Sequence, residues 1–207
     1  MSLDTYANLQ TEIAEELNRD DLSTKAQTFI ALAEAQMNRD IRHWRMEKRD
    51  TLSASGQYTQ RPTDWLETIR LWVTGSGTTN LQLSSMATMA DRREAAEDAG
   101  GAPKYYAHVE DDIELYPSPD DTYTLGILYY QKIPALSDSN TTNWLLTNHP
   151  DVYFYGALLH SAPYLQEDAR ITVWAQLYSA AVANLNAESD RAKMSGSGLK
   201  LKIRGLG

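Results

Sequence analysis

The period of the apolar residues changes along the chain, and this change limits the folds that the chain can adopt. Near the N-terminus, apolar residues recur every three or four positions, as on one face of a helix. The first such stripe consists of Tyr6, Leu9, Ile13 and Leu17. A second, longer stripe predicts a second helix and consists of Leu22, Ala26, Phe29, Ile30, Ala33, Met37, Ile41 and Trp44. The charged residues 39–49 are expected to form the end of this helix.

The middle of the chain follows a two-residue period instead, which is typical of β-strands. A turn predicted at residues 75–77 joins two alternating runs into a hairpin whose apolar residues are Ile69, Leu71, Val73, Leu81 and Leu83. Residues 86–98, rich in alanine, methionine and charge, predict a short helix. Three further strands are predicted as an antiparallel meander, at residues 105–110, 113–116 and 122–132.

The helical period returns after a polar loop, from Pro150, a residue that suits the first turn of a helix. One predicted face there carries Val152, Tyr155, Leu159 and Ala162. After Pro163, a last helix is predicted whose apolar face consists of Ile171, Trp174, Tyr178, Ala181 and Leu185.

Helices that enclose a central sheet make the chain an α+β protein, which we expect to be predominantly helical. The terminal helices should form a bundle with a small central antiparallel β-sheet region and an extended C-terminal arm. The predicted parts are an N-terminal helical pair (1–50), a central antiparallel sheet region with a short helix (51–134), a C-terminal helical pair packing on the first (135–194) and the arm (195–207).

Composition excludes several classes of protein. The 207 residues include no cysteine, which removes disulfides, thiolate nucleophiles and cysteine-based metal sites. No apolar run approaches the ~20 residues of a membrane span. The N-terminus also lacks the basic and apolar regions of a signal peptide. We therefore expect a soluble protein that is made and used in a cytoplasm, with no membrane partner.

The formal net charge is −9, and it is unevenly distributed. Residues 190–207 hold five basic side chains and one acidic side chain, so this tail carries +4 and the rest of the chain −13. An acidic body argues against broad binding of nucleic acid phosphates. Apolar and basic residues alternate within the tail, as in a segment that adds a strand to a partner or enters its groove. The predicted docking arm is Leu199, Lys200, Leu201, Lys202, Ile203 and Arg204.

The residues that could carry chemistry have simpler structural interpretations. None of the four histidines belongs to the His-Glu-x-x-His pair of a zinc helix. His149 precedes a predicted helix and His160 lies within it, so both are expected to be structural. The acidic stretches 110–112 and 120–121 lack the spacing of a calcium loop and predict solvated turns. We expect no catalytic residue, no metal and no cofactor.

A long and ordered set of segments resembles a known family, the neck adaptor proteins of tailed bacteriophages. The likeness covers most of the chain, although residues 75–104 match poorly. Its most specific part is the run LYYQKIPALSD at residues 128–138, followed by TNWLL at 142–146 and PDVYFYGAL at 150–158. Weaker matches are at residues 17–22, 29–34, 46–49, 162–165, 168–170 and Trp174.

The resemblance implies a structural role rather than catalysis. Family members form a ring below the portal, so we expect a homo-oligomeric ring, a dodecamer, that joins capsid to tail. DNA would pass through it without sequence-specific binding. Residues 199–204 would bind the portal protein, and a downstream neck or tail protein would be a further partner. The implied location is the virion neck at the head-tail junction, after assembly in the host cytoplasm. Candidates for packing between subunits are Trp144, Tyr155, Trp174 and Tyr178.

Two other classes of function stay open on the sequence alone. A phage-encoded cell-wall hydrolase would need a metal site or a pair of carboxylates, and carboxylates far apart in the chain can meet in the fold. A DNA-binding packaging protein would use the basic tail, and its affinity for DNA would fall with added salt.

Overall fold

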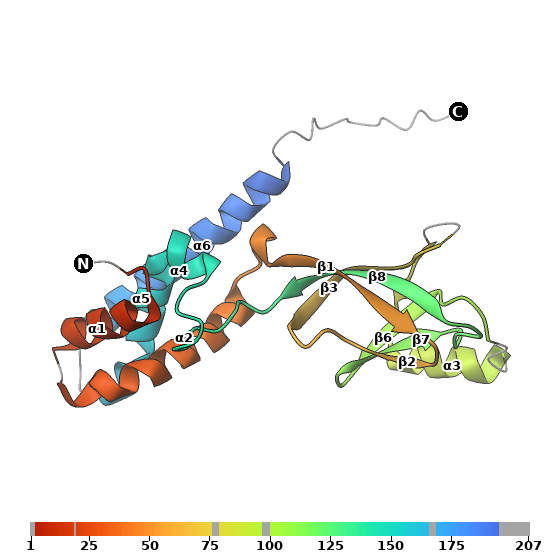
Figure 1. Ribbon diagram of the computed structural model, residues 1–207, viewed down its shortest axis with the longest axis horizontal. Helices are drawn as coiled ribbons and strands as arrows, with labels where there is room; N and C mark the ends of the chain where they lie inside the picture. The colour runs from red at the N-terminus through yellow and green to blue at the C-terminus, as the bar shows by residue number, and fades with distance from the viewer. Residues whose placement is uncertain (1–2, 19, 76–78, 97–99, 166–168, 195–207) are drawn as a thin grey trace. The chain divides into compact units, whose positions relative to one another are not determined.

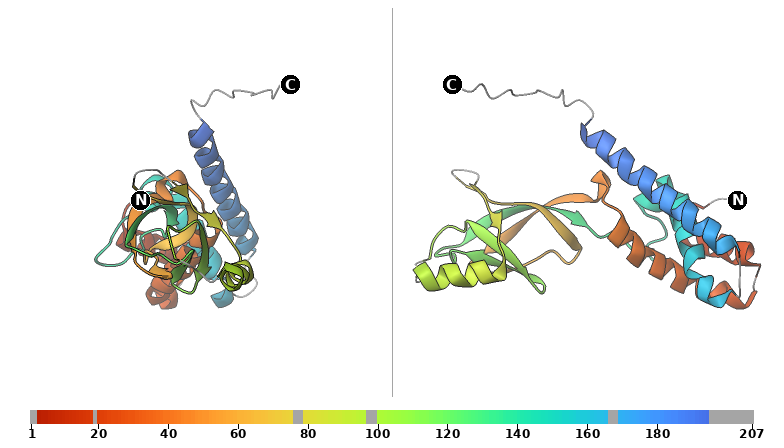
Figure 2. Two further views of the ribbon diagram at one scale, coloured as in Figure 1. Left: turned by 90° about the vertical axis from the view of Figure 1, so that its right-hand side faces the viewer. Right: turned by 180° about the vertical axis from the view of Figure 1, so that it is seen from behind.

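The computed structural model divides the chain into two compact units (Figures 1 and 2). The helical unit consists of residues 1–44 and 133–207, so both ends of the chain contribute to it. The β unit consists of the intervening residues 45–132. The residues that the structure describes are 3–18, 20–75, 79–96, 100–165 and 169–194.

In the helical unit, the helix α5 (Pro150–His160) packs against both α2 (Ala26–Asp40) and α6 (Arg170–Met194). A Cβ atom at Gly156 of α5 would lie 3.2 Å from both the Met37 and the Tyr178 side chains, so glycine permits this close packing. The other described helices of the unit are α1 (Tyr6–Leu17), α4 (Trp144–Asn148) and the short 3-10 turns η1 (Asp20–Lys25) and η3 (Ala162–Tyr164).

Helix α1 forms where the apolar period predicts it. The Thr5 hydroxyl accepts a hydrogen bond from the Asn8 backbone amide at 3.3 Å and so caps the N-terminus. Asn18 ends the helix in a left-handed conformation, with a φ of 48°, which is a common helix C-terminus. The predicted apolar face is confirmed, since the buried residues of α1 are Tyr6, Leu9, Ile13 and Leu17.

Helix α2 ends earlier than the sequence predicts. Its predicted apolar face is confirmed as far as Ile41, which is buried, but the helix ends at Asp40. The 3-10 turn η2 (Trp44–Met46) and the strand β1 (Glu47–Ala54) follow. The helical prediction for residues 41–49 was therefore wrong. The charges of this stretch suit a helix end, but charge alone has no period and fits an exposed strand equally well.

The β unit contains two four-stranded sheets. Sheet A has the strand order β1, β8, β3, β4, and sheet B has the order β2, β7, β6, β5. Only Leu81 separates β4 from β5, so the chain passes there from one sheet to the other. The remaining elements are β2 (Tyr58–Gln60), β3 (Trp65–Val73), β4 (Thr79–Asn80), β5 (Gln82–Leu83), α3 (Met86–Ala96), β6 (Tyr105–Val109), β7 (Asp112–Tyr116) and β8 (Tyr123–Gln131).

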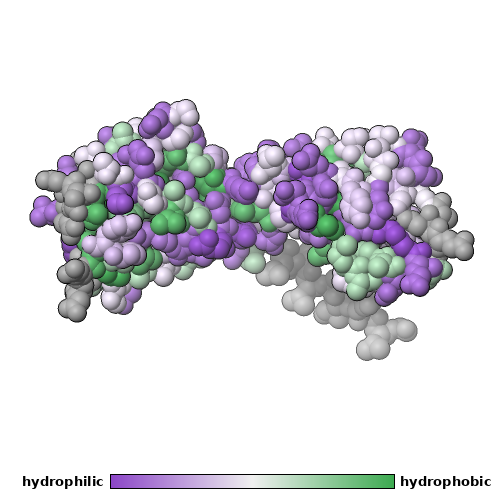
Figure 3. Space-filling view, turned by 90° about the horizontal axis from the view of Figure 1, so that it is seen from below, coloured by the Kyte–Doolittle hydropathy of each residue, from purple (hydrophilic) through white to green (hydrophobic). Residues whose placement is uncertain are grey.

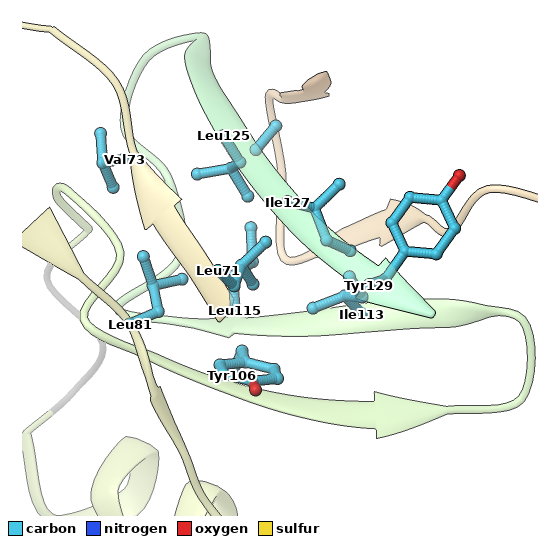
Figure 4. Close-up of a cluster of buried hydrophobic side chains, with 10 residues drawn as sticks. Leu71, Val73, Leu81, Tyr106, Ile113, Leu115, Leu125, Ile127 and Tyr129 are labelled. Atoms are coloured by element: carbon cyan, nitrogen blue, oxygen red, sulfur yellow. The ribbon is translucent and has the colours of Figure 1, made fainter. Parts of the chain in front are cut away.

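The two sheets share one hydrophobic core, shown in Figure 4. Sheet A contributes Leu71, Val73, Leu125, Ile127 and Tyr129, and sheet B contributes residues that include Tyr106, Ile113 and Leu115. Because neighbouring side chains of a strand point to opposite faces of the sheet, the residues between these lie on the outer face of sheet A. They include Arg70, Trp72, Gly126 and Leu128.

The prediction of a predominantly helical chain with a small central sheet was wrong. Helices hold about 49% of the residues and strands about 24%, and the strands form two sheets with their own core. The hairpin predicted after Val73 is confirmed in the first pairs of its strands, where Trp72 lies opposite Asn80 and Val73 opposite Thr79. Leu83, however, belongs to sheet B and pairs in parallel with β6. The predicted meander was also wrong, because β8 lies between β1 and β3 and not beside β7.

Candidate interaction surfaces

A buried polar network fixes the segment by which the chain re-enters the helical unit. The Glu34 carboxylate of α2 is 8% exposed, and it accepts hydrogen bonds from the Leu136 backbone amide at 2.7 Å and the Tyr153 hydroxyl at 3.1 Å. The Asn143 amide donates to the same hydroxyl at 2.6 Å and to the Pro134 carbonyl at 2.7 Å. Burial raises the pKa of the Glu34 carboxyl, and its two hydrogen bonds oppose this rise.

An aromatic cluster fixes the segment by which the chain leaves the helical unit. His43 is fully buried, and its ring stacks on Trp144 with 5.2 Å between ring centroids. Trp44 also packs against the His43 ring, with 5.3 Å between the two ring centroids. The Trp44 backbone amide donates to the Ser189 hydroxyl of α6 at 2.9 Å. Both connections of the helical unit are thus held by side chains from several of its helices.

Large apolar side chains are exposed on the helical unit. Val173 and Leu177 of α6 are 52% and 39% exposed, and they lie one helical turn apart on the same face. Leu32 of α2 is 47% exposed. Figure 3 shows apolar residues among polar ones on one face of this unit. Exposed apolar side chains that recur along one helix are typical of a surface that packs on another protein.

Two of the four aromatic residues predicted to pack between subunits lie in the core of their own chain. Trp174 is 4% exposed and Tyr178 is 3% exposed. The Tyr178 hydroxyl also donates to the Asp40 carboxylate of α2 at 3.1 Å. Trp144 stacks on His43, and Tyr155 is half-buried beside Phe154, with 5.6 Å between their ring centroids. Contact of these four residues with another copy stays a prediction.

The exposed pair Val173 and Leu177 was not predicted from the sequence. Each directly precedes one of the buried aromatic residues on α6. The apolar residues of this helix therefore extend around more of its surface than one buried stripe requires. This wide distribution of apolar residues around the helix could have indicated a second packing surface, because a helix with a single packing face needs only one apolar stripe.

The histidines have structural surroundings. His149 precedes α5, but its side chain makes no capping hydrogen bond, and its ring packs edge-on against that of His43, 6.4 Å away. His160 is half-buried in α5. Burial lowers the pKa of His160, and the nearby Arg39 guanidinium lowers it further. The surroundings of His160 therefore disfavour its charged form.

The acidic turns are held by local contacts. The Asp120 carboxylate accepts from the Tyr123 hydroxyl at 2.7 Å, and the Asp121 carboxylate accepts from the Thr122 amide at 2.6 Å. Such short-range bonds are typical of aspartate in turns. Within the described ranges of the chain, no three histidine or acidic side chains are grouped so that they could hold a metal ion.

A cavity of about 490 Å³ in the β unit has a cationic and aromatic lining that includes Arg61, Trp65 and Lys132. The Arg61 guanidinium stacks on Trp65, 4.1 Å from the ring centroid, and pairs with the Asp111 carboxylate at 3.3 Å. Hydrolysis of the paired-carboxylate type needs two carboxyl groups. Asp111 is the one carboxylate that lines this cavity, so the cavity does not provide that pair.

The predicted portal-binding arm, Leu199, Lys200, Leu201, Lys202, Ile203 and Arg204, lies outside the described residues. None of the described helices combines the length and the apolar character needed to cross a membrane.

Comparison with protein families identifies the kind of protein that carries these surfaces. A family model described as SU10 adaptor protein matches residues 4–199. The chain belongs to the SU10 adaptor family. The resemblance to phage head-tail adaptors is therefore confirmed, and the protein is a structural component of a bacteriophage virion. Adaptor families are structural and not enzymatic, which disfavours a cell-wall hydrolase. A search of curated proteins found no match.

Proposed function

We propose that this SU10 adaptor forms a ring at the virion neck, below the portal, that joins the capsid to the tail and lets DNA pass. The observation that carries the proposal is the family match over residues 4–199. The exposed apolar side chains of α6 support it, because apolar side chains gathered on one helix face suit a contact with another subunit. We expect the ring to be a dodecamer and to contact a downstream neck or tail protein on its other side.

Contacts between neighbouring copies are proposed to include Val173 and Leu177. Full burial of one valine or leucine side chain stabilises by about 1.5–3 kcal/mol. Each of these two side chains is already about half-buried, so each can add about 1 kcal/mol when a neighbour covers it. One such contact is weak. A closed ring repeats it at every interface, and repeated contacts raise the overall avidity.

Attachment to the portal protein is proposed to use residues 199–204 as an arm. Leu199, Leu201 and Ile203 supply alternating apolar side chains, and the residues between them are basic. An extended segment of this kind can add to a sheet edge or enter a groove, where main-chain hydrogen bonds and alternate side chains both contribute. A ring would present one arm per copy and so attach at many points.

Passage of DNA is proposed to depend on the acidic body of the protein. The chain outside residues 190–207 carries a net charge of −13. A channel lined by an acidic surface has few cations to hold the phosphates, so DNA can slide through without sequence-specific binding.

The test is the removal of residues 195–207 from the full-length adaptor in a phage that lacks its own copy of the gene. The truncated subunit should fold, because the described elements of both units end before residue 195. It should no longer join portal-containing heads to tails. A control lacking only residues 205–207 keeps the proposed arm and should join them normally. Normal joining by the longer deletion would refute the arm.

A further inference from the structure

The outer face of sheet A holds an unusual arrangement around Trp72. Gly126 of β8 lies opposite Thr51 on one side and Trp72 on the other. A Cβ atom at Gly126 would come within 2.2 Å of the indole ring, so the ring lies directly on the glycine. The indole therefore covers the middle of the sheet from its place on β3. It is half-buried, and its outer surface stays accessible.

Two arginines flank this indole. Arg49 of β1 and Arg70 of β3 lie on opposite sides of Leu128 in the next row of the sheet. Their guanidinium groups are 5.4 Å and 5.0 Å from the centroid of the Trp72 ring, which is within the range of a cation–π contact. We call Arg49, Arg70 and Trp72 the Trp72 platform. It presents two charges on strands that are about 10 Å apart, since neighbouring strands lie about 4.8 Å apart.

Neither guanidinium has a carboxylate partner among the described residues. The Arg70 Nε donates to the Asn80 side-chain oxygen at 2.7 Å, and the Arg49 guanidinium packs on the indole. Three other cations of the β unit do have acidic partners: Lys48 pairs with Asp64, Arg61 with Asp111 and Arg93 with Glu114. Both platform arginines are exposed, so their hydrogen-bonding groups are available to a partner.

The neighbouring row of the same face is acidic. It consists of Glu47 and Glu67 on either side of Tyr130. Both glutamates have contacts of their own. They do limit what that partner can be. A nucleic acid carries a charge on every phosphate along its backbone, and this row would repel it. A single carboxylate side chain on a protein can reach the arginines without extending over the acidic row, so it meets less of that repulsion.

We propose that the Trp72 platform binds carboxylate side chains of a second copy of this chain. Arginine binds carboxylates through a fork of two N–H donors, and stacking on the indole holds that fork in place. The chain has 28 acidic and 19 basic residues, so another copy offers an excess of carboxylates. One example is Asp151 at the start of α5, which is exposed. This contact rests on the proposed ring and would act beside the apolar contact of α6.

The experiment measures self-association of the purified full-length protein by sedimentation velocity over a range of concentrations, without heads or tails. Wild type should associate reversibly, and added salt should weaken the association. The double variant Arg49→Glu and Arg70→Glu should associate at least about tenfold more weakly, because like charges then face each other. The control is Lys104→Glu with Lys132→Glu, which changes the net charge equally on exposed residues of the same unit and should associate like wild type.

Three results would overturn the proposal. Wild type could stay monomeric at every concentration, the platform variants could associate as strongly as wild type, or the control variant could lose association as much as the platform variants do. DNA binding by wild type that the platform variants lose would favour a nucleic acid partner instead. Arg49→Ala with Arg70→Ala gives a second, milder test if the reversed charges impair folding. Because no heads are present, a negative result leaves the adaptor role itself unaffected.

Discussion

Replacing Glu34 by alanine is expected to destabilise the helical unit by about 2–4 kcal/mol. The substitution removes the acceptor for two donors, the Leu136 amide and the Tyr153 hydroxyl. A buried donor without a partner costs about 1–3 kcal/mol. Two such losses are partly offset because the variant no longer buries a carboxylate whose pKa is raised by desolvation.

The variant Glu34→Gln should distinguish the contribution of the hydrogen bonds from that of the carboxylate charge, because it keeps an acceptor oxygen but cannot ionise. The amide oxygen of Glu34→Gln can accept both bonds, so this variant should stay within about 1 kcal/mol of wild type. The pH dependence should differ. The pKa of Glu34 is raised above its ordinary 4.5, so the folded protein keeps the proton to a higher pH than the unfolded chain does. Wild type should therefore lose stability relative to Glu34→Gln as the pH rises from 4.5 through the folded-state pKa.

The assay is urea unfolding followed by circular dichroism, at a series of pH values, on wild type and both variants. Near neutral pH, the free energy of unfolding of Glu34→Ala should be well below those of wild type and Glu34→Gln. If Glu34→Ala is as stable as Glu34→Gln, the network does not hold the re-entering segment. If the difference between wild type and Glu34→Gln does not change with pH, the carboxylate is not buried as described.

Three further changes test other parts of the structure. Gly126→Ala should destabilise the β unit by about 1–3 kcal/mol in thermal unfolding, because the added methyl group must displace the Trp72 ring. Burial, followed by a smaller effect of a nearby guanidinium, lowers the pKa of His108 from 6.5. Stability should therefore fall as the pH drops below 6.5, and His108→Gln should reduce that fall. Val173→Asp with Leu177→Asp should destabilise the subunit by no more than about 2 kcal/mol, because both side chains are only half-buried, but it should prevent the subunit from completing virions, as scored by plaque assay.

The two helices near the N-terminus could be predicted because their apolar residues follow one clear period, whereas of the face predicted for α5 only Val152 is buried. Tyr6, Leu9 and Ile13 all lie in the core, as their spacing indicates. The β unit was harder, because alternation reveals a strand but not its partner. Nothing local to β8 indicates that Ile127 should lie between Asp50 and Leu71, residues far from it in the sequence. Long-range pairing of this kind depends on the whole core and not on any single segment.

The interaction surfaces were predicted less well than the helices, for a physical reason. A sequence shows that Trp174 and Tyr178 are large and apolar, and such residues suit a core as well as an interface. Only the packing of α6 against its neighbours shows that these two are buried while Val173 and Leu177 are exposed. Arg49 and Arg70 could not be predicted to lie beside Trp72 either, because only the pairing register of β1, β8 and β3 places both arginines next to that indole.

The most direct test of the adaptor role is electron microscopy of virions in which the subunit carries a label. The account predicts a ring of label at the junction of head and tail, and heads without tails when the gene is deleted. Complete virions assembled without the protein, or label found only elsewhere on the particle, would contradict it.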